Sequence, residues 1–241
     1  LCDKPLATSL EEADRIGVAC REVPLLFALD RRWAASYQAA RRLIAEGAIG
    51  PLTSMVACGL PNLINPGCHW YDALLALAGD SEPVWVSGLV DDVAGEPEDS
   101  RGHLDPPGRA QIGLAEALVL YITPDGAHDR ARLNIEVVGE KGRLLLFDDA
   151  RESFIWLEDG GMRPLELPVD TEPWPAGTAM VRDLVRAVQE DERTACDVEQ
   201  ARRATEIGFA IHVSSARDGA RVELPVSERT LRLESFPWGN E

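Results

Sequence analysis

A histidine and an aspartate interrupt an otherwise apolar stretch, residues 65–79, which reads NPGCHWYDALLALAG. Their spacing of three places His69 and Asp72 on one face of a helix. A buried polar group without a partner costs about 1–3 kcal/mol, so each of them needs one. The positive end of the helix disfavours a protonated ring, which leaves an imidazole that can accept a proton. Two interpretations follow: a His–Asp pair that satisfies itself, which the spacing alone favours, or the proton acceptor of an active site.

The residues around this pair predict a buried helix. Asn65 suits the N-cap, Pro66 suits the first helical position, and Gly79 suits the exit, so we expect a helix from about residue 66 to 78. Its apolar side chains cover nearly the whole circumference, which is the pattern of a helix surrounded by protein.

Composition narrows the classes of partner. The 241 residues are 45% hydrophobic and 27% charged, with a formal net charge of −17. This acidity argues against nucleic acid, whose binding requires Lys and Arg against phosphates. No apolar run approaches the roughly 20 residues that span a bilayer, so we expect no membrane partner. Five cysteines without a C-x-x-C pair or a Cys/His cluster indicate reduced thiols, a cytoplasmic location and no metal site.

The front of the chain predicts a strand, a helix and a strand. Thr8 with Glu11, or Ser9 with Glu12, forms a capping box before a helix over about residues 9–22. The apolar run at residues 25–29 is typical of a buried parallel strand, and a helix over about residues 34–46 follows. Because the first strand is cut short and the chain starts with leucine, we expect an N-terminally incomplete sequence.

The rest of the chain predicts a sheet followed by helices. Alternating patterns and turn residues predict strands at residues 52–58, 84–90, 114–122, 132–138, 143–147, 154–157 and 163–167. Residues 94–109 form a polar loop that is long for a plain connector. Helices are expected at about residues 178–189 and 198–217, the second capped by Asp197 with Gln200, before a last strand at residues 221–224.

These elements, in this order, resemble the large family of glucose-fructose oxidoreductase, inositol dehydrogenase and MocA-like proteins. The resemblance spans nearly the whole chain. It rests on these segments: CDKPLA at residues 2–7, DRRW at 30–33, GAIG at 47–50, GCHWYD at 67–72, GEKG at 139–142, and the closing helix through Ala210 and Ser214 to Leu224-Pro225.

The resemblance implies an α/β protein in which the end of a Rossmann domain precedes an α+β substrate domain with an open mixed β-sheet flanked by helices. Residues 1–33 would be the C-terminal remnant of the dinucleotide-binding domain, and residues 34–241 the substrate-binding or oligomerisation domain. The implied cofactor is NAD or NADP. The G-x-G-x-x-G turn that holds its pyrophosphate is absent from the sequence, so we expect the 241 residues alone to bind a dinucleotide poorly.

The resemblance also assigns the site. Lys4 and His69 would be catalytic, the histidine as base and the ammonium as the group that stabilises negative charge on the reacting oxygen. From DKP alone, a surface lysine in a turn would be the default interpretation of Lys4. Substrate contacts are expected from Asn65, Asp72 and Arg31, and cofactor contacts from Lys4, Pro5 and Arg32.

Two departures from the family bear on substrate. Asn65 stands where many members carry an aspartate, and an amide can bind a hydroxyl but cannot take its proton. The link from Gly59 to Asn65 is short, so contacts made by a longer loop would be missing. Asp3 replaces the more usual glutamate, which keeps the charge with a shorter reach.

The sequence therefore predicts an NAD(P)-dependent oxidoreductase acting on a secondary hydroxyl of a sugar or cyclitol. The alternative is a catalytically silent ligand-binding or oligomerisation module of the same fold. A homodimer or homotetramer is expected under either hypothesis.

The remaining histidines are weak signals of a metal site. His103 with Asp105 and His128 with Asp129 imitate metal pairs in polar loops, and His212 is expected to pack on the closing helix.

Overall fold

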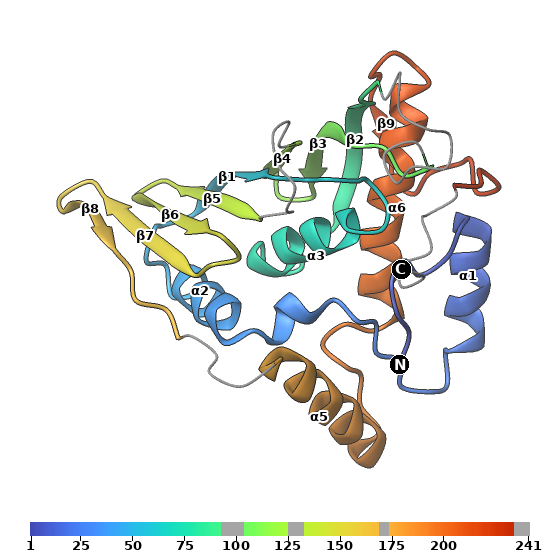
Figure 1. The fold of residues 1–241 in the computed structure, drawn as a ribbon, viewed down its shortest axis with the longest axis horizontal. Coiled ribbons are helices and arrows are strands. Elements are labelled where there is room, and N and C mark those ends of the chain that lie inside the picture. Colours follow the sequence, from blue (N-terminus) through green and yellow to red (C-terminus); the bar gives the residue numbers. More distant parts are fainter. Residues whose placement is uncertain (93–103, 125–132, 169–173, 234–241) are drawn as a thin grey trace.

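The computed structural model describes residues 1–92, 104–124, 133–168 and 174–233 (Figure 1). Its described part contains one sheet of nine strands in the order β8-β7-β6-β5-β1-β4-β3-β2-β9. β1 and β4 run parallel, and the other neighbours are antiparallel. The strands are β1 (Leu52–Cys58), β2 (Pro83–Val90), β3 (Gly108–Leu114), β4 (Val119–Thr123), β5 (Asn134–Gly139), β6 (Gly142–Phe147), β7 (Glu152–Leu157), β8 (Gly161–Pro164) and β9 (Val222–Glu223).

Burial alternates along the strands, so the two faces of the sheet differ. In β6, Leu144 and Leu146 are buried, whereas Arg143 and Phe147 are exposed. This alternation is expected when one face packs on a core and the other faces solvent. The helices α2 (Ala35–Ala45), α3 (Gly67–Leu77) and α6 (Val198–Ser215) cover the buried face, with α3 in contact with β1, α2 and α6 (Figure 1). The predicted open mixed sheet flanked by helices is confirmed.

The N-terminal segment lies beside α6. Helix α1 (Leu10–Ala19) packs on α6 and is capped by Ser9, whose hydroxyl accepts the backbone N–H of Glu12 at 3.2 Å. The expected strand at residues 25–29 is buried but does not form: a single parallel bridge joins Cys2 to Phe27. The run meets two short partners and no strand of matching length in the described structure: Cys2 bonds to Leu26 and Ala28 on one side, and the carbonyl of Cys196 accepts the N–H of Phe27. A 3₁₀ helix, η1 (Asp30–Trp33), follows and contacts α5 (Pro175–Glu190).

The strand predicted at residues 114–122 is wrong, because the chain turns back within it. β3 ends at Leu114, β4 begins at Val119, and the backbone N–H of Leu114 donates to the carbonyl of Leu118 at 2.8 Å. Ala117 takes a positive φ of 61° in this turn, a conformation that alanine does not signal. β3 also begins at Gly108, within the predicted 94–109 loop. Residues 94–103 of that loop lie outside the described residues. Across the described ranges, no helix has both the length and the hydropathy that crossing a bilayer requires.

Candidate active site

Lys4 and Asn65, which are far apart in the sequence, meet at the start of α3. The ammonium of Lys4 donates a hydrogen bond from Nζ to Oδ1 of Asn65. Asn65 is buried and Lys4 is half-buried. A half-buried lysine held by an amide oxygen has a fixed charge position, unlike the free surface lysine that a turn would present.

Asn65 does not cap the helix, so that prediction is wrong. The N-cap is Pro66, whose backbone is already helical, with φ −72° and ψ −30°, and no side chain caps the helix. The amide oxygen of Asn65 is instead engaged by Lys4. The predicted span of 66–78 otherwise agrees with α3 to within one residue at each end.

Asp105 holds the segment that carries Asn65. Its carboxylate is buried and accepts the backbone N–H groups of Ile64 and Asn65, each at 2.8 Å. The side-chain amide of Asn62 donates to the backbone carbonyl of Asp105, and the N–H of Leu63 donates to that of Pro106 at 3.0 Å. Sequence reasoning missed this role and weighed Asp105 only beside His103. His103, His128 and Asp129 lie outside the described residues.

His69 lies in the first turn of α3 with a neutral ring. Burial lowers the pKa of His69 to about 3, and the positive charges of Arg31 and Lys4 lower it further. The nearest carboxylate is Asp30, with Oδ1 3.7 Å from Nδ1, which is too long for a hydrogen bond. Asp30 therefore does not offset the burial of the ring, and Nδ1 is buried without a hydrogen-bond partner. About 16% of the side chain is exposed, so the accessible part of the ring lies away from Nδ1.

Asp72 pairs with Arg32 and not with His69, which corrects the expected His–Asp pair. The Nε atom of Arg32 donates to both carboxylate oxygens of Asp72, at 2.8 and 2.9 Å. Nη2 of Arg32 lies 2.7 Å from an oxygen of Asp72 and 2.7 Å from one of Asp80. Burial raises the pKa of Asp72, and the guanidinium of Arg32 opposes that rise.

A contact of Arg32 with cofactor and a contact of Asp72 with substrate stay predictions, although the two side chains pair with each other. The side chain of Arg32 is 2% exposed and that of Asp72 is 1% exposed, and Arg32 is one of the residues that line an open pocket of about 630 Å³. The pair joins η1 to the centre of α3. The spacing of His69 and Asp72 did not reveal that Asp72 pairs with Arg32 and that Nδ1 of His69 is left without a hydrogen-bond partner.

Arg31 remains close to His69. Its Nε donates to Asp149 at 2.7 Å, and its guanidinium lies 5.2 Å from the centre of the Trp70 ring. The carboxylate of Asp149 raises the pKa of Arg31, which therefore stays charged. A contact of Arg31 with substrate stays a prediction. Pro5 follows Lys4 along the chain and lies beside an open pocket of about 1080 Å³ on the surface of α1.

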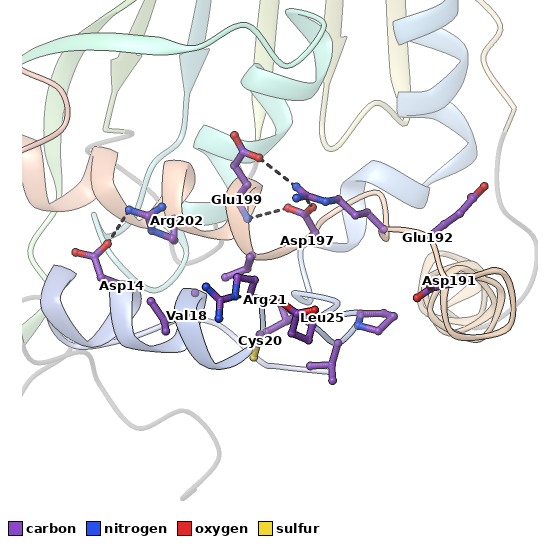
Figure 2. Close-up of a pocket in the computed structure, with 16 residues that line it drawn as sticks. Asp14, Val18, Cys20, Arg21, Leu25, Asp191, Glu192, Asp197, Glu199 and Arg202 are labelled. Carbon is purple, nitrogen blue, oxygen red and sulfur yellow. Dashed lines mark hydrogen bonds and ion pairs between the residues drawn. The ribbon is translucent and has the colours of Figure 1, made fainter.

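Another open pocket, of about 880 Å³, lies between the end of α1, residues 20–25 and the start of α6 (Figure 2). Charged side chains line it in pairs, such as Asp14 with Arg202 at 2.6 Å and Glu199 with Arg193 at 3.3 Å. None of the candidate site residues lines this pocket. Among the residues that the structure describes, no three His, Cys, Asp or Glu side chains gather as metal ligands. His212 is half-buried on α6, and burial lowers its pKa to about 4.

Comparison with known proteins shows the fold. No protein-family model matches the sequence, and no curated protein matches it. An oxidoreductase domain protein from Kribbella flavida superposes with a TM-score of 0.80 at 18% identity, over 93% of this chain and 73% of that one. Levoglucosan dehydrogenase in complex with NADH and L-sorbose gives 0.80 at 20% identity, over 93% and 73%. Aldose-aldose oxidoreductase from Caulobacter crescentus complexed with glycerol gives 0.78 at 18% identity, over 92% and 71%. At such identities the likeness establishes a shared architecture.

Proposed function

We propose that this protein is an NAD(P)-dependent oxidoreductase that oxidises a secondary hydroxyl of a sugar or cyclitol. The observation that carries the proposal is the meeting of Lys4, Asn65 and a neutral His69 at the N-terminal end of α3. The fold adds support, because similar structures contain NADH with levoglucosan or L-sorbose. In this function the half-buried ammonium of Lys4 and the unprotonated imidazole of His69 act together on the substrate.

Oxidation of an alcohol requires two groups from the protein: a proton acceptor, and a positive charge near the oxygen that becomes the carbonyl oxygen. His69 is unprotonated at neutral pH and takes the hydroxyl proton at its accessible nitrogen. The ammonium of Lys4 donates a hydrogen bond to the same oxygen and stabilises its developing negative charge. A base with a pKa of about 3 is weak, so the imidazolium needs help; a closer approach of Asp30 to Nδ1 would supply it.

The donor set near Lys4 fits one end of a nicotinamide dinucleotide. When bound, NAD(P)⁺ would accept the hydride from the carbinol carbon. Lys4 and Pro5 would lie at the nicotinamide end, because they follow the short bridge between Cys2 and Phe27. The pyrophosphate end requires a run of backbone N–H groups, which a G-x-G-x-x-G turn supplies. These 241 residues do not contain that motif. The expected cofactor contact of Arg32 is not part of the proposal.

The substrate side of the site is polar but not acidic. Asn65 offers its amide N–H₂ to a hydroxyl while its oxygen receives Lys4. Arg31 adds fixed donors, its guanidinium lying over the ring of Trp70, which is buried. These groups suit a neutral polyol, and they are the basis on which the proposal names a sugar or cyclitol.

A homodimer or homotetramer built through the sheet is part of the proposal. On the face away from the helices, Tyr121, Phe147, Trp156 and Met162 are each more than a third exposed. The register aligns Trp156 with Met162 on adjacent strands, so these two side chains form an exposed apolar surface. This surface is also what favours the second candidate function, a silent oligomerisation module.

The test measures NADH binding and turnover separately. NADH fluorescence is titrated with the 241-residue chain and with any upstream-extended form that its gene encodes, and reduction of NAD⁺ or NADP⁺ is followed with a panel of sugars and cyclitols. We expect Lys4→Ala and His69→Ala to lower kcat about 10²–10⁴-fold while NADH still binds. Lys141→Ala is the matched control, because Lys141 is an exposed lysine in the β5–β6 turn. If no form binds NADH and no polyol is oxidised, the oxidoreductase is refuted and the silent module remains.

A further inference from the structure

The segment from Asn62 to Asn65 is fixed from both sides by buried polar groups. Its backbone N–H groups at Ile64 and Asn65 donate to the carboxylate of Asp105. Its carbonyls at Leu63 and Asn65 accept the hydroxyl of Tyr71 at 2.9 Å and the thiol of Cys68 at 2.9 Å. The carbonyl contacts come from α3 itself, whereas Asp105 lies 40 residues from Asn65 in sequence. The carboxylate thus ties the segment to the residues that lead into β3.

The two amides require a carboxylate. Each oxygen of Asp105 accepts one N–H, at 2.8 Å in both cases, and the side chain is buried. An asparagine in its place would present an N–H₂ group to one of the amides, which would leave a buried donor without an acceptor. Burial raises the pKa of Asp105 to about 6, opposed by the amide bonds and by the charge of Lys4, so the group is ionised at neutral pH.

The carboxylate of Asp105 also affects the position of the Lys4 ammonium. The ammonium donates to the amide oxygen of Asn65, and the position of that oxygen depends on the backbone that Asp105 holds. A chain of contacts therefore runs from the Asp105 carboxylate through the Asn65 backbone and side chain to Nζ of Lys4. The other titratable groups that face Asp105 are Cys68 and Tyr71, both buried and uncharged at neutral pH.

We propose that Asp105 is a positioning residue, which fixes Asn65 so that the amide oxygen of Asn65 holds the ammonium of Lys4 in place. The inference rests on the proposed function only in that it gives Lys4 a catalytic task. The geometry itself can be tested without cofactor or substrate. Asp105 acts on Lys4 through Asn65, and not by a direct contact.

The test uses the scarcity of lysine in this chain, which has two, Lys4 and Lys141. Trace acylation with acetic anhydride at pH 7.5, read by peptide mass spectrometry, gives the rate at Lys4 relative to the exposed Lys141. In Asp105→Asn we expect the Lys4:Lys141 ratio to rise about fivefold, the size expected when one hydrogen bond of ordinary strength is lost. Asp105→Glu, which keeps two acceptor oxygens, should recover part of the change.

A double-mutant cycle separates positioning from direct electrostatics. In an Asn65→Ala background, Asp105→Asn should change the Lys4:Lys141 ratio much less than it does with Asn65 present, because only the direct effect of the Asp105 charge remains. A change of the same size in both backgrounds would mean that Asp105 acts on Lys4 by charge alone, and would overturn the proposal. So would an unchanged ratio in a folded Asp105→Asn protein, with folding checked by circular dichroism.

If Asp105→Asn does not fold, the unmodified protein still provides the test. The Lys4:Lys141 ratio is measured from pH 5 to 8, where protonation of Asp105 should produce an inflection near its pKa of about 6. His69 does not titrate in this range, since its pKa is about 3. A ratio without an inflection would overturn the proposal. Loss of NADH binding or of turnover would leave these ratios unaffected, so failure of the proposed function is distinguishable from failure of this inference.

Discussion

Replacing Arg32 by methionine should destabilise the protein strongly, although Arg32 lies outside the proposed chemistry. Arg32 donates to both oxygens of Asp72, and its Nη2 also lies 2.7 Å from Asp80. Methionine retains much of the aliphatic length but leaves the Asp72 carboxylate without a charged partner. That carboxylate is 1% exposed, so water cannot replace the lost donors.

The magnitude follows from the burial of the pair. Removing one partner of a buried ion pair costs about 3–5 kcal/mol, because the charge that remains is not solvated. For a chain of this length, 1 kcal/mol corresponds to roughly 2–4 °C in Tm, so we expect a loss on the order of 10 °C. Arg41 provides the matched control: it binds the same Asp80 at 2.7 Å, but its side chain is 44% exposed. Arg41→Ala should cost less than about 1 kcal/mol.

Urea denaturation followed by circular dichroism gives the free energy of unfolding of each variant. A second comparison isolates the cause: in Arg32→Met with Asp72→Leu, both charges are replaced by apolar groups, and most of the lost stability should return. If Arg32→Met costs no more than Arg41→Ala, the pair does not hold η1 against α3. If the double variant is as unstable as the single one, the loss is due to packing and not to an uncompensated charge.

Three further predictions concern the site and the sheet. Asp30→Asn should lower kcat about tenfold, a part of the roughly 10²–10⁴-fold contributed by a positioned base, with NADH binding unchanged; an unaltered kcat would exclude Asp30 as the partner of His69. Because the pKa of His69 falls from 6.5 to about 3 on folding, the unfolded chain binds the proton first and stability falls as pH drops through that window. His69→Gln should therefore lose less stability than wild type in guanidinium titrations between pH 6.5 and 4, and parallel losses would contradict the assignment. Trp156→Glu with Met162→Glu should convert an oligomer to a monomer in light scattering, whereas Val188→Glu, on the equally exposed surface of α5, should not.

The fold was predictable where a local pattern decides it. β1 has the expected bounds, residues 52–58, because alternating side chains and a preceding Gly-Pro define both its faces and its start. The Asp197–Gln200 capping box was also predicted from the sequence, and it is present at the start of α6. The hairpin between β3 and β4 was not, because the sequence Ala115-Glu116-Ala117 carries no turn residue. Residues 25–29 were correctly predicted as buried, but a strand also needs a partner of equal length, and composition does not show that.

The sequence predicted which residues share the buried helix α3, but not which residues they contact. His69 and Asp72 do share a helix, but Asp72 pairs with Arg32 whereas His69 lies 3.7 Å from Asp30 without a hydrogen bond. Both Arg32 and Asp30 belong to η1, whose place against α3 no local spacing encodes. The pairing of Asp72 with an arginine could have been expected from burial, because a carboxylate in the middle of a buried helix needs a cation from another element. The segment DRRW, which follows a buried run, supplies two arginines.

The role of Asp105 could not be predicted from its neighbours in the sequence. Its sequence neighbours made it look like half of a loop metal pair, whereas its oxygens bind two backbone amides 40 and 41 residues away. Asn65 drew attention as a departure from an expected aspartate, and the structure gives that departure a physical context. With Asp105 already charged and buried behind the segment, an aspartate at position 65 would place a second carboxylate beside it, and the two would compete for the single ammonium of Lys4. A neutral amide accepts from Lys4 without that repulsion, so position 65 and Asp105 are coupled. Asn65→Asp should therefore be tolerated better in an Asp105→Asn background than alone, and equal losses of stability in the two backgrounds would refute this coupling.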